Sequence, residues 1–207
     1  MKNFLAIDTS CNYLTVLAVK DGQTFSEFLP DCSMRHSIKL MEAVDTVLKK
    51  AQMRLQDFDF FAAVVGAGSF TGIRIAISVV KGFCLATGKP SLAVTSFDVA
   101  AYNAIDEGKI LCLVDALHDC YYACGYEKGK ISLQPAFLEE AEILRLAQEG
   151  YALTACSPMP IQDKAKLTLA DPVLGLKNAA CALAEQEKFG ELKALYVRKS
   201  SAELNQR

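Results

Sequence analysis

The fold is decided by residues 4–29, FLAIDTSCNYLTVLAVKDGQTFSEFL. They predict three consecutive strands, over 4–7, 13–20 and 24–29. Asp21-Gly22 separates the last two strands, and this dipeptide favours a tight hairpin because such a turn needs positive φ at both central positions. The chain therefore opens with an antiparallel meander.

The same plan returns later in the chain. Asp115 lies 107 positions after Asp8, and Gly129 lies 107 positions after Gly22. The second copy predicts strands over 111–114 and 121–127, a turn at Lys128-Gly129 and another short strand. We interpret the chain as two similar half-domains, residues 1–104 and 105–207.

Helices follow the first meander. A spacing of three or four residues predicts a helix over about 33–51 with Ser33 as its N-cap. The apolar positions of this amphipathic helix are Met34, Ile38, Met41, Val44, Leu48 and Ala51. A strand over 60–65 leads through a glycine loop into a helix over about 73–87, which Gly88 ends. The remaining predicted elements are a strand over 92–95 and helices over 96–104, 139–148 and 174–188. This alternation indicates an α/β fold with a mixed sheet in each half.

The composition is that of an ordinary soluble chain. The 207 residues include 24 acidic and 22 basic side chains, for a net charge of -2, and no Lys/Arg cluster of the kind that free-standing nucleic-acid binders use. The N-terminus reaches Asp8 after four apolar residues, too few for a signal peptide. No apolar run reaches the roughly 18 residues of a membrane span. We therefore expect a cytoplasmic protein without a membrane partner.

The metal ligands and general bases are few. The eight cysteines include no CxxC pair, and most lie in predicted strands or helices, so buried thiols are a better interpretation than disulfides or zinc. His36 has Leu40 rather than a second ligand four residues on, and nothing distinguishes either His36 or His118 from an exposed histidine. We predict neither a metal site nor a catalytic residue.

Acidic residues lie at matching strand ends in the two halves. Asp8-Thr9-Ser10 follows the first strand, and Asp115 holds the same place in the second copy. Paired acids facing each other across a cleft are where a duplicated nucleotide-binding fold would hold magnesium and phosphate. An aspartate at a strand end is also a common turn former. Both interpretations stay open, so these four residues are candidates for a vestigial phosphate site.

The glycine loop matches neither standard phosphate motif. Its glycines fall at 66, 68 and 72, whereas a dinucleotide fingerprint needs Gly at 71 and a Walker loop needs Lys after Gly72. Ser69 and Thr71 remain as possible helix caps, with Arg74 in the first turn. The loop is either an anion site, since free amides point outward there, or a structural elbow without a ligand.

The helix after this loop is apolar around more than half of its circumference. Ile73, Ile77, Val80 and Cys84 form one face, and Ile75, Val79, Phe83 and Ala86 form a second. Such a helix is either enclosed by its own half-domain or faces another subunit.

Four segments carry a family resemblance: 4–10, FLAIDTS; 68–75, GSFTGIRI; Asp115-Ala116; and 195–198, LYVR. Together they resemble the TsaB (YeaZ) family, a subunit of the bacterial machinery that makes threonylcarbamoyladenosine in tRNA. The resemblance implies the duplicated actin-like ATPase (ribonuclease H-like) fold, with two βββαβα halves. It also implies a non-catalytic subunit that binds and activates the catalytic paralogue TsaD, together with the ATPase TsaE. ATP and magnesium then belong to the complex, and tRNA is reached through it.

The resemblance also implies an interface. In this family the heterodimer forms through the first two helices, which correspond here to about 33–51 and 72–87, and the same surface forms a homodimer when TsaD is absent. The interface residues it points to are Met41, Val44, Leu48, Ile75, Val79 and Phe83.

The chain departs from this pattern in places. The metal-binding histidine pair of the paralogue and its Gly-Gly adenosine turn are missing, and Ala67 replaces the usual proline. Two other functions stay open. One is a stand-alone enzyme, an ATP-dependent phosphotransferase or a glycoprotease-like hydrolase that uses Asp8 and Asp115. The other is a homodimeric interaction protein without a link to tRNA.

Overall fold

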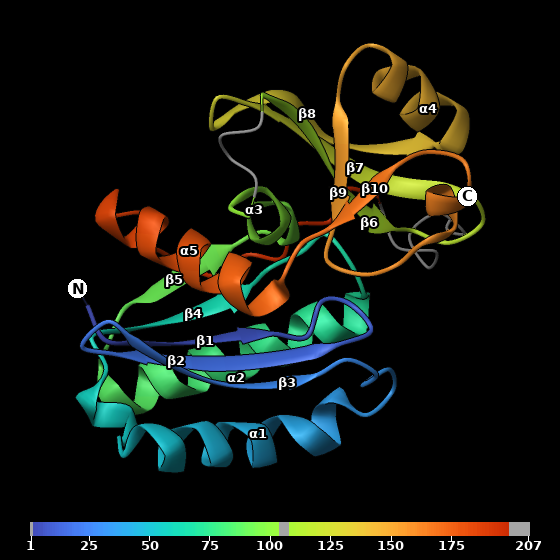
Figure 1. Ribbon diagram of the computed structural model, residues 1–207. Helices are drawn as coiled ribbons and strands as arrows, with labels where there is room; N and C mark the ends of the chain where they lie inside the picture. The colour runs from blue at the N-terminus through green and yellow to red at the C-terminus, as the bar shows by residue number, and fades with distance from the viewer. Residues whose placement is uncertain (1, 104–107, 199–207) are drawn as a thin grey trace, which may run out of the picture.

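The computed structural model describes residues 2–103 and 108–198, and it contains two five-stranded mixed sheets (Figure 1). The strands of the first sheet are β1 (Phe4–Asp8), β2 (Leu14–Lys20), β3 (Gln23–Leu29), β4 (Phe60–Val64) and β5 (Ser91–Val94), in the order β3-β2-β1-β4-β5. Those of the second are β6 (Lys109–Asp115), β7 (Cys120–Glu127), β8 (Lys130–Glu139), β9 (Ala152–Ala155) and β10 (Leu167–Leu169), in the order β10-β9-β6-β7-β8.

The two sheets have the same topology. In each, the first strand is central, pairing antiparallel with the second strand and parallel with the fourth. This arrangement confirms the predicted duplicated actin-like, ribonuclease H-like fold. The boundary predicted between residues 104 and 105 lies outside the described residues.

Both predicted hairpin turns are present. Asp21 and Gly22 have φ of 49° and 85°, and Lys128 and Gly129 have φ of 49° and 72°. Each turn joins its strands through a two-residue loop, because Lys20 pairs with Gln23 and Glu127 pairs with Lys130. The last strand of the second meander was predicted to be short. It has ten residues, and irregular pairing around Gly125 lets it follow β7 along its whole length.

The helices follow the predicted order. They are α1 (His36–Ala51), α2 (Phe70–Thr87), α3 (Ser96–Ala101), α4 (Glu140–Gln148) and α5 (Pro172–Glu185), with single 3₁₀ turns η1 (Leu55–Asp57) and η2 (Pro160–Asp163). In the second half, η2 stands where α2 stands in the first. The prediction that α3 reaches Ala104 ends outside the described residues, since the described helix stops at Ala101.

The start of α1 was wrongly predicted, and its predicted apolar positions lie on two faces. Ser33 belongs to a turn in which the Arg35 amide donates to the Cys32 carbonyl, and Met34 has φ of 63°, so the helix begins only at His36. Of the predicted apolar positions, Val44 and Ala51 face the sheet, whereas Met34, Ile38 and Met41 are 96%, 72% and 47% exposed. The whole face toward the sheet contains His36, Leu40, Ala43, Val44, Val47 and Ala51.

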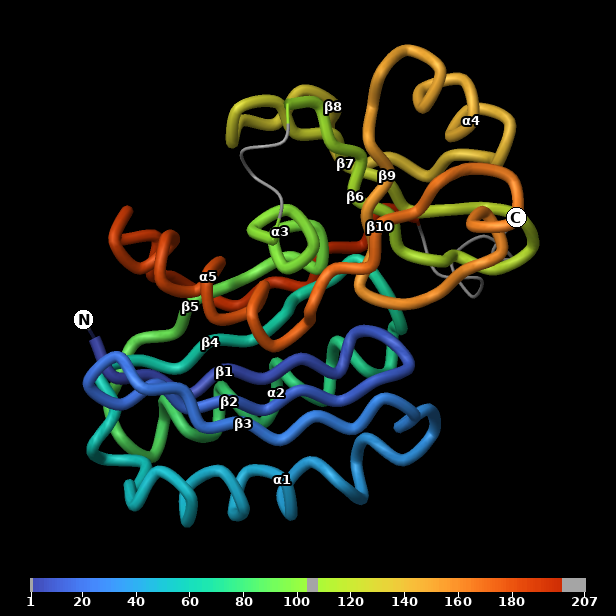
Figure 2. Tube along the Cα trace, viewed as in Figure 1, coloured from blue at the N-terminus to red at the C-terminus, as the bar shows by residue number. Residues whose placement is uncertain are grey.

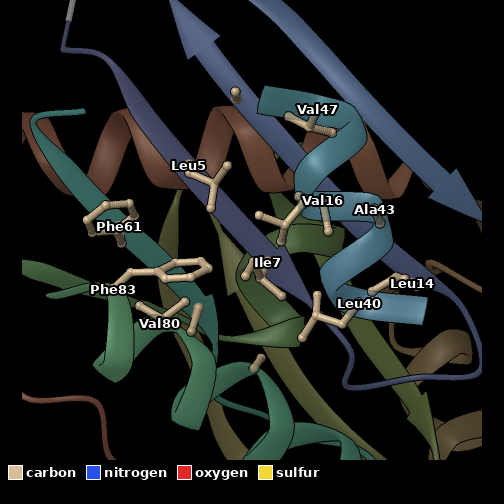
Figure 3. Packing of buried hydrophobic residues seen from close by; sticks show 14 of the residues in the cluster. Leu5, Ile7, Leu14, Val16, Leu40, Ala43, Val47, Phe61, Val80 and Phe83 are labelled. Atoms are coloured by element: carbon tan, nitrogen blue, oxygen red, sulfur yellow. The ribbon is translucent and has the colours of Figure 1, made fainter. Parts of the chain in front are cut away.

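The first sheet is covered on both faces (Figure 1). Alternate residues of β1 separate the two cores, because successive strand side chains point to opposite faces. Leu5 and Ile7 pack against α1 and α2 (Figure 3), whereas Phe4 and Ala6 pack against Leu176 and its neighbours on α5. The last helix of the second half therefore completes the core of the first.

Helix α3 lies between the two sheets (Figure 2). Val99 packs in the α5 core, while Phe97, Ala100 and Ala101 pack against β6 and β7 of the second sheet. The other face of that sheet is covered by α4 through Ile143 and Leu146. The chain then returns to the first half, where the Leu195 amide donates to the Val65 carbonyl at 2.7 Å.

One expectation about membrane spans was wrong. By length and composition alone, α2 is long and apolar enough to cross a membrane, and it is the one such helix in the described part of the chain. In this fold, however, it buries a face of six residues against the first sheet: Gly72, Ile73, Ala76, Ile77, Val80 and Phe83. All eight cysteines are free thiols; Cys32, Cys112 and Cys124 are buried, as predicted for most of them, whereas the other five are only partly buried.

Candidate functional site

A cavity of about 510 Å³ lies between the two halves. The first half contributes the segment after β1, residues 10–13, the turn before α1 and the glycine loop. The second half contributes residues 113–117 at the end of β6, Tyr122 and residues 156–159. The Ser157 hydroxyl donates to Asn12 Oδ1 at 3.0 Å, so the two halves are joined directly at this cavity.

Only one member of the predicted aspartate pair lines the cavity. Asp115 is exposed there, and its Oδ1 accepts from the Leu117 amide at 2.7 Å. Asp8 is fully buried: Oδ1 accepts from the Ser10 amide at 2.8 Å and the Ser10 hydroxyl at 2.6 Å, and Oδ2 accepts from the Tyr13 hydroxyl at 2.9 Å. Asp8 therefore stabilises the segment that follows β1, and it is not placed to share a magnesium ion with Asp115.

Burial raises the pKa of Asp8 above its ordinary value, against the opposing effect of the hydrogen bonds from Ser10 and Tyr13. A carboxyl whose pKa is raised by folding stabilises the fold below its unfolded pKa, and this contribution is lost as the pH rises through the folded pKa. We therefore expect Asp8→Asn to raise the free energy of unfolding at neutral pH and to reduce its decline with pH above about 4. Asp8→Ala should instead lower it by about 1–3 kcal/mol, because the buried Tyr13 hydroxyl loses its acceptor.

Urea unfolding of both variants between acid and neutral pH measures this difference. Asp119→Asn, which changes an exposed aspartate, is the matched control and should leave the profile unaltered. Equal destabilisation by Asp8→Asn and Asp8→Ala at neutral pH would contradict the assignment, since it would mean that the fold requires the negative charge.

The glycine loop forms an elbow that packs on the end of β1. The Ser69 amide donates to the Ser10 carbonyl at 2.7 Å, and the Thr9 hydroxyl donates to the Gly72 carbonyl at 2.6 Å. Ser69 caps α2, as predicted, by accepting from the Gly72 amide at 3.2 Å. The elbow interpretation thus fits the structure better than an anion site.

The Arg74 side chain contacts Phe70 and Tyr196. Its guanidinium carbon lies 3.8 Å from the centre of the Phe70 ring, and its Nε donates to the Tyr196 hydroxyl at 2.9 Å. Phe70 and Tyr196 themselves stack, with ring centres 4.8 Å apart. This arrangement holds the returning segment onto the start of α2, so Arg74 does not provide a free cation for a phosphate.

Among the described residues that line the cavity, no hydroxyl or thiol is hydrogen-bonded to a histidine. His36 is buried, contrary to the exposed histidine expected, and its Nε2 lies 2.9 Å from the Tyr13 carbonyl oxygen, where it donates. Burial raises the pKa of Cys11 to about 12, so this thiol stays protonated. Within residues 2–103 and 108–198, no three His, Cys, Asp or Glu side chains are arranged to hold a metal ion.

The predicted interface residues divide into two groups. Val44 and Phe83 were wrongly predicted to lie on the surface. Both are buried in the core of the first half, where Phe83 packs against Phe61 with ring centres 5.6 Å apart. Met41 is exposed, and Leu48, Ile75 and Val79 are partly buried. Two exposed apolar residues of these helices, Ile38 and Leu85, were not among the predicted interface residues, because the spacing of apolar residues does not show which of them face solvent.

Known proteins match this chain in sequence and in structure. The family model TsaD, tRNA N6-adenosine threonylcarbamoyltransferase, matches residues 28–203. The TsaB proteins, "tRNA threonylcarbamoyladenosine biosynthesis protein TsaB", of Buchnera aphidicola (strain Sg) and Bacillus subtilis are 32% and 30% identical over 100 and 124 residues. These matches cover 48% and 59% of this chain and 47% and 54% of the relatives, so the chain spans about half the length of the curated relatives it matches.

YeaZ from Pseudomonas aeruginosa has the same fold, with a TM-score of 0.79 and 24% identity over 95% of this chain and all of that one. The family model covers most of the chain, and the curated relatives with about 30% identity include TsaB proteins. The chain therefore belongs to the TsaD family of proteins and, within it, to the TsaB (YeaZ) group.

Proposed function

We propose that this protein is a non-catalytic subunit of the machinery that makes threonylcarbamoyladenosine in tRNA, and that it binds and activates a TsaD-like catalytic paralogue. Family membership and the role named for the TsaB relatives support the pathway. The partner is proposed to dock on the outer face of the first half, over α1 and α2.

The observation that carries this proposal is a set of exposed and partly buried apolar side chains on these two helices, here called the α1/α2 surface. On α2 they are Ile75, Val79 and Ala86, which share one flank with Gly82. On α1 they are Met41 and Leu48, which lie on the flank opposite Lys50, together with the exposed Ile38. Exposed apolar side chains gathered on neighbouring helices are typical of a protein interface.

The cavity offers little support for the alternative of a stand-alone phosphotransferase or hydrolase. Both carboxylate oxygens of Asp8 already accept hydrogen bonds, from Ser10 and Tyr13. Asp115 has no second carboxylate beside it in the described cavity lining. We propose that ATP and magnesium act on other subunits of the complex, among them a TsaE-like ATPase. In this proposal the protein works in the cytoplasm, reaches tRNA through the complex and self-associates through the same α1/α2 surface when its partner is absent.

Co-purification tests the proposal. The full chain, mixed with its TsaD-like and TsaE-like partners with and without Mg-ATP, should elute as a complex with the TsaD-like protein, and deleting its gene should remove threonylcarbamoyladenosine from tRNA. Normal modification in a clean deletion would refute the proposed function. Tight Mg-ATP binding by the isolated chain, abolished by Asp8→Ala, would favour the enzyme instead.

A further inference from the structure

A second cavity lies where β1 and β4 begin, at the edge of the first sheet opposite the cavity between the halves (Figure 1). Its volume of about 780 Å³ is within the roughly 300–1,000 Å³ typical of small-molecule sites. One side consists of residues at the start of these two strands, and the other consists of the last turn of α5 and the segment up to Phe189. Its described lining shares no residue with the α1/α2 surface or with the cavity between the halves.

Three phenylalanine rings line this cavity and contact one another. Phe4 and Phe60 stack with ring centres 4.8 Å apart, and Phe189 packs edge-on against Phe60 with ring centres 5.2 Å apart. The Lys2 ammonium group lies 4.5 Å from the centre of the Phe189 ring. Ring faces attract cations at such distances, because the π-system carries negative charge on its faces. The chain's own lysine therefore shows that an ammonium group fits on this side of the cavity.

Carboxylates outnumber cations around the cavity. Asp59, Glu185 and Glu187 line it, and Lys2 is the one basic residue in the described lining, so three negative charges and one positive charge leave a net charge of -2. Glu185 and Glu187 are exposed and form no ion pair with any residue of 2–103 or 108–198. The last turn of α5 adds partial negative charge, as the end of a helix does. The cavity therefore favours a ligand with two or more positive charges.

A metal ion does not suit this lining. In the part of the chain that the structure describes, no three His, Cys, Asp or Glu side chains are arranged as metal ligands. Phenylalanine rings also supply no oxygen ligand of the kind that hard cations need. An aliphatic amine suits it better, because its methylene groups pack on the rings while its ammonium groups reach the carboxylates.

We propose that this cavity binds a linear aliphatic polyamine. One ammonium group takes the place of the Lys2 ammonium over Phe189, and the others lie near Asp59 on one side and Glu185 on the other. The cavity lies on the face of the first sheet that α5 covers, whereas α1 and α2 cover the other face. The polyamine site is therefore independent of the proposed docking of a TsaD-like partner, and the tests of the two proposals can fail separately.

Spermidine and Mg²⁺ distinguish a built site from loose attraction of counterions, since only spermidine has an aliphatic chain. We expect titration calorimetry of the full chain at about 150 mM NaCl to give a Kd for spermidine about 10-fold or more below that for Mg²⁺. Glu185→Gln removes one charge at constant size and should raise the spermidine Kd about 3-fold or more. Asp45→Asn removes an exposed carboxylate of α1 outside the cavity lining and should leave this Kd unchanged.

Replacing Lys2 should have the opposite effect. Lys2→Ala uncovers the face of Phe189 and removes the competing positive charge, so the spermidine Kd should fall about 3-fold or more. Lys188→Ala is the matched control, because it removes an exposed lysine from the same segment outside the described lining. This variant should bind spermidine as the parent protein does.

The Cys181 thiol reports binding inside the cavity directly. It lines the cavity and is partly buried, and spermidine at about ten times its Kd should slow its alkylation by iodoacetamide about 5-fold or more. Cys84 on α2, also partly buried and outside the described lining, is the internal control and should react at an unchanged rate. The proposal is overturned if Mg²⁺ binds as tightly as spermidine, if Lys2→Ala weakens spermidine binding, or if spermidine leaves the alkylation of Cys181 unchanged.

Discussion

Replacing Gly72 by alanine is expected to lower the free energy of unfolding by roughly 3–5 kcal/mol, enough to unfold much of the protein near physiological temperature. The added methyl group would lie 1.9 Å from the Thr9 carbonyl oxygen and 3.1 Å from its carbonyl carbon. Both are backbone atoms of the segment that ends β1, so relief requires α2 to move away from the sheet. That movement would also break the 2.6 Å hydrogen bond from the Thr9 hydroxyl to the Gly72 carbonyl.

Urea unfolding monitored by circular dichroism measures this loss. The matched control is Gly82→Ala in the same helix, where a new methyl group meets no atom within 4 Å. Alanine there should raise stability by about 0.5–1 kcal/mol, because glycine is a poor helix former. If Gly72→Ala unfolds at the same urea concentration as the parent chain, α2 does not pack on β1 as described.

Gly82→Glu is expected to abolish binding of the TsaD-like partner while leaving this protein folded. Gly82 is exposed on the α2 flank that carries Val79 and Ala86, and the open space around it accepts a longer side chain. A carboxylate placed there would be buried without a charged partner when the TsaD-like protein covers the α1/α2 surface. We expect Kd to rise about 100-fold, or roughly 2.7 kcal/mol, in calorimetry or in a pull-down titration.

The control for this prediction adds the same side chain elsewhere. Gln148→Glu places a carboxylate at the exposed end of α4 in the second half, away from the α1/α2 surface. This variant should bind the TsaD-like partner as the parent protein does. Circular dichroism and thermal unfolding check that Gly82→Glu keeps its fold. A folded Gly82→Glu protein that binds its partner with parental affinity would place the interface elsewhere.

Local signals in the sequence predicted much of the fold. The hairpin turns at Asp21-Gly22 and Lys128-Gly129 follow from backbone requirements that involve only adjacent residues, and the structure confirms both. Ser69 and Gly88 likewise mark the ends of α2 through short-range hydrogen bonds and a left-handed terminus. The constant offset between the two meanders predicted a shared topology without any knowledge of contacts between the halves.

The predictions that failed depended on long-range packing. On α1, the predicted apolar positions include both Val44 and Ile38, and contact with β2 buries Val44 while Ile38 stays exposed. Phe83 could equally have faced solvent, but Phe61 on β4 provides its place in the core. The hydrogen bond to Asp8 Oδ2 depends on the path of the backbone from β1 to β2, which brings the Tyr13 hydroxyl back to this oxygen. Spacing alone does not contain this information.

The position of α5 has a consequence for the order of folding. Pro172, where α5 begins, is 164 positions after Asp8, where β1 ends, and these elements share one core. During synthesis the first sheet leaves the ribosome with α1 and α2 on one face. Phe4 and Ala6 on the other face stay exposed until α5 has been synthesised. At ribosomal rates of about 5–20 residues per second, synthesis of these 164 residues takes roughly 8 to 33 seconds. High contact order of this kind slows folding, so the nascent chain is a natural client for chaperones that shield apolar sheet faces.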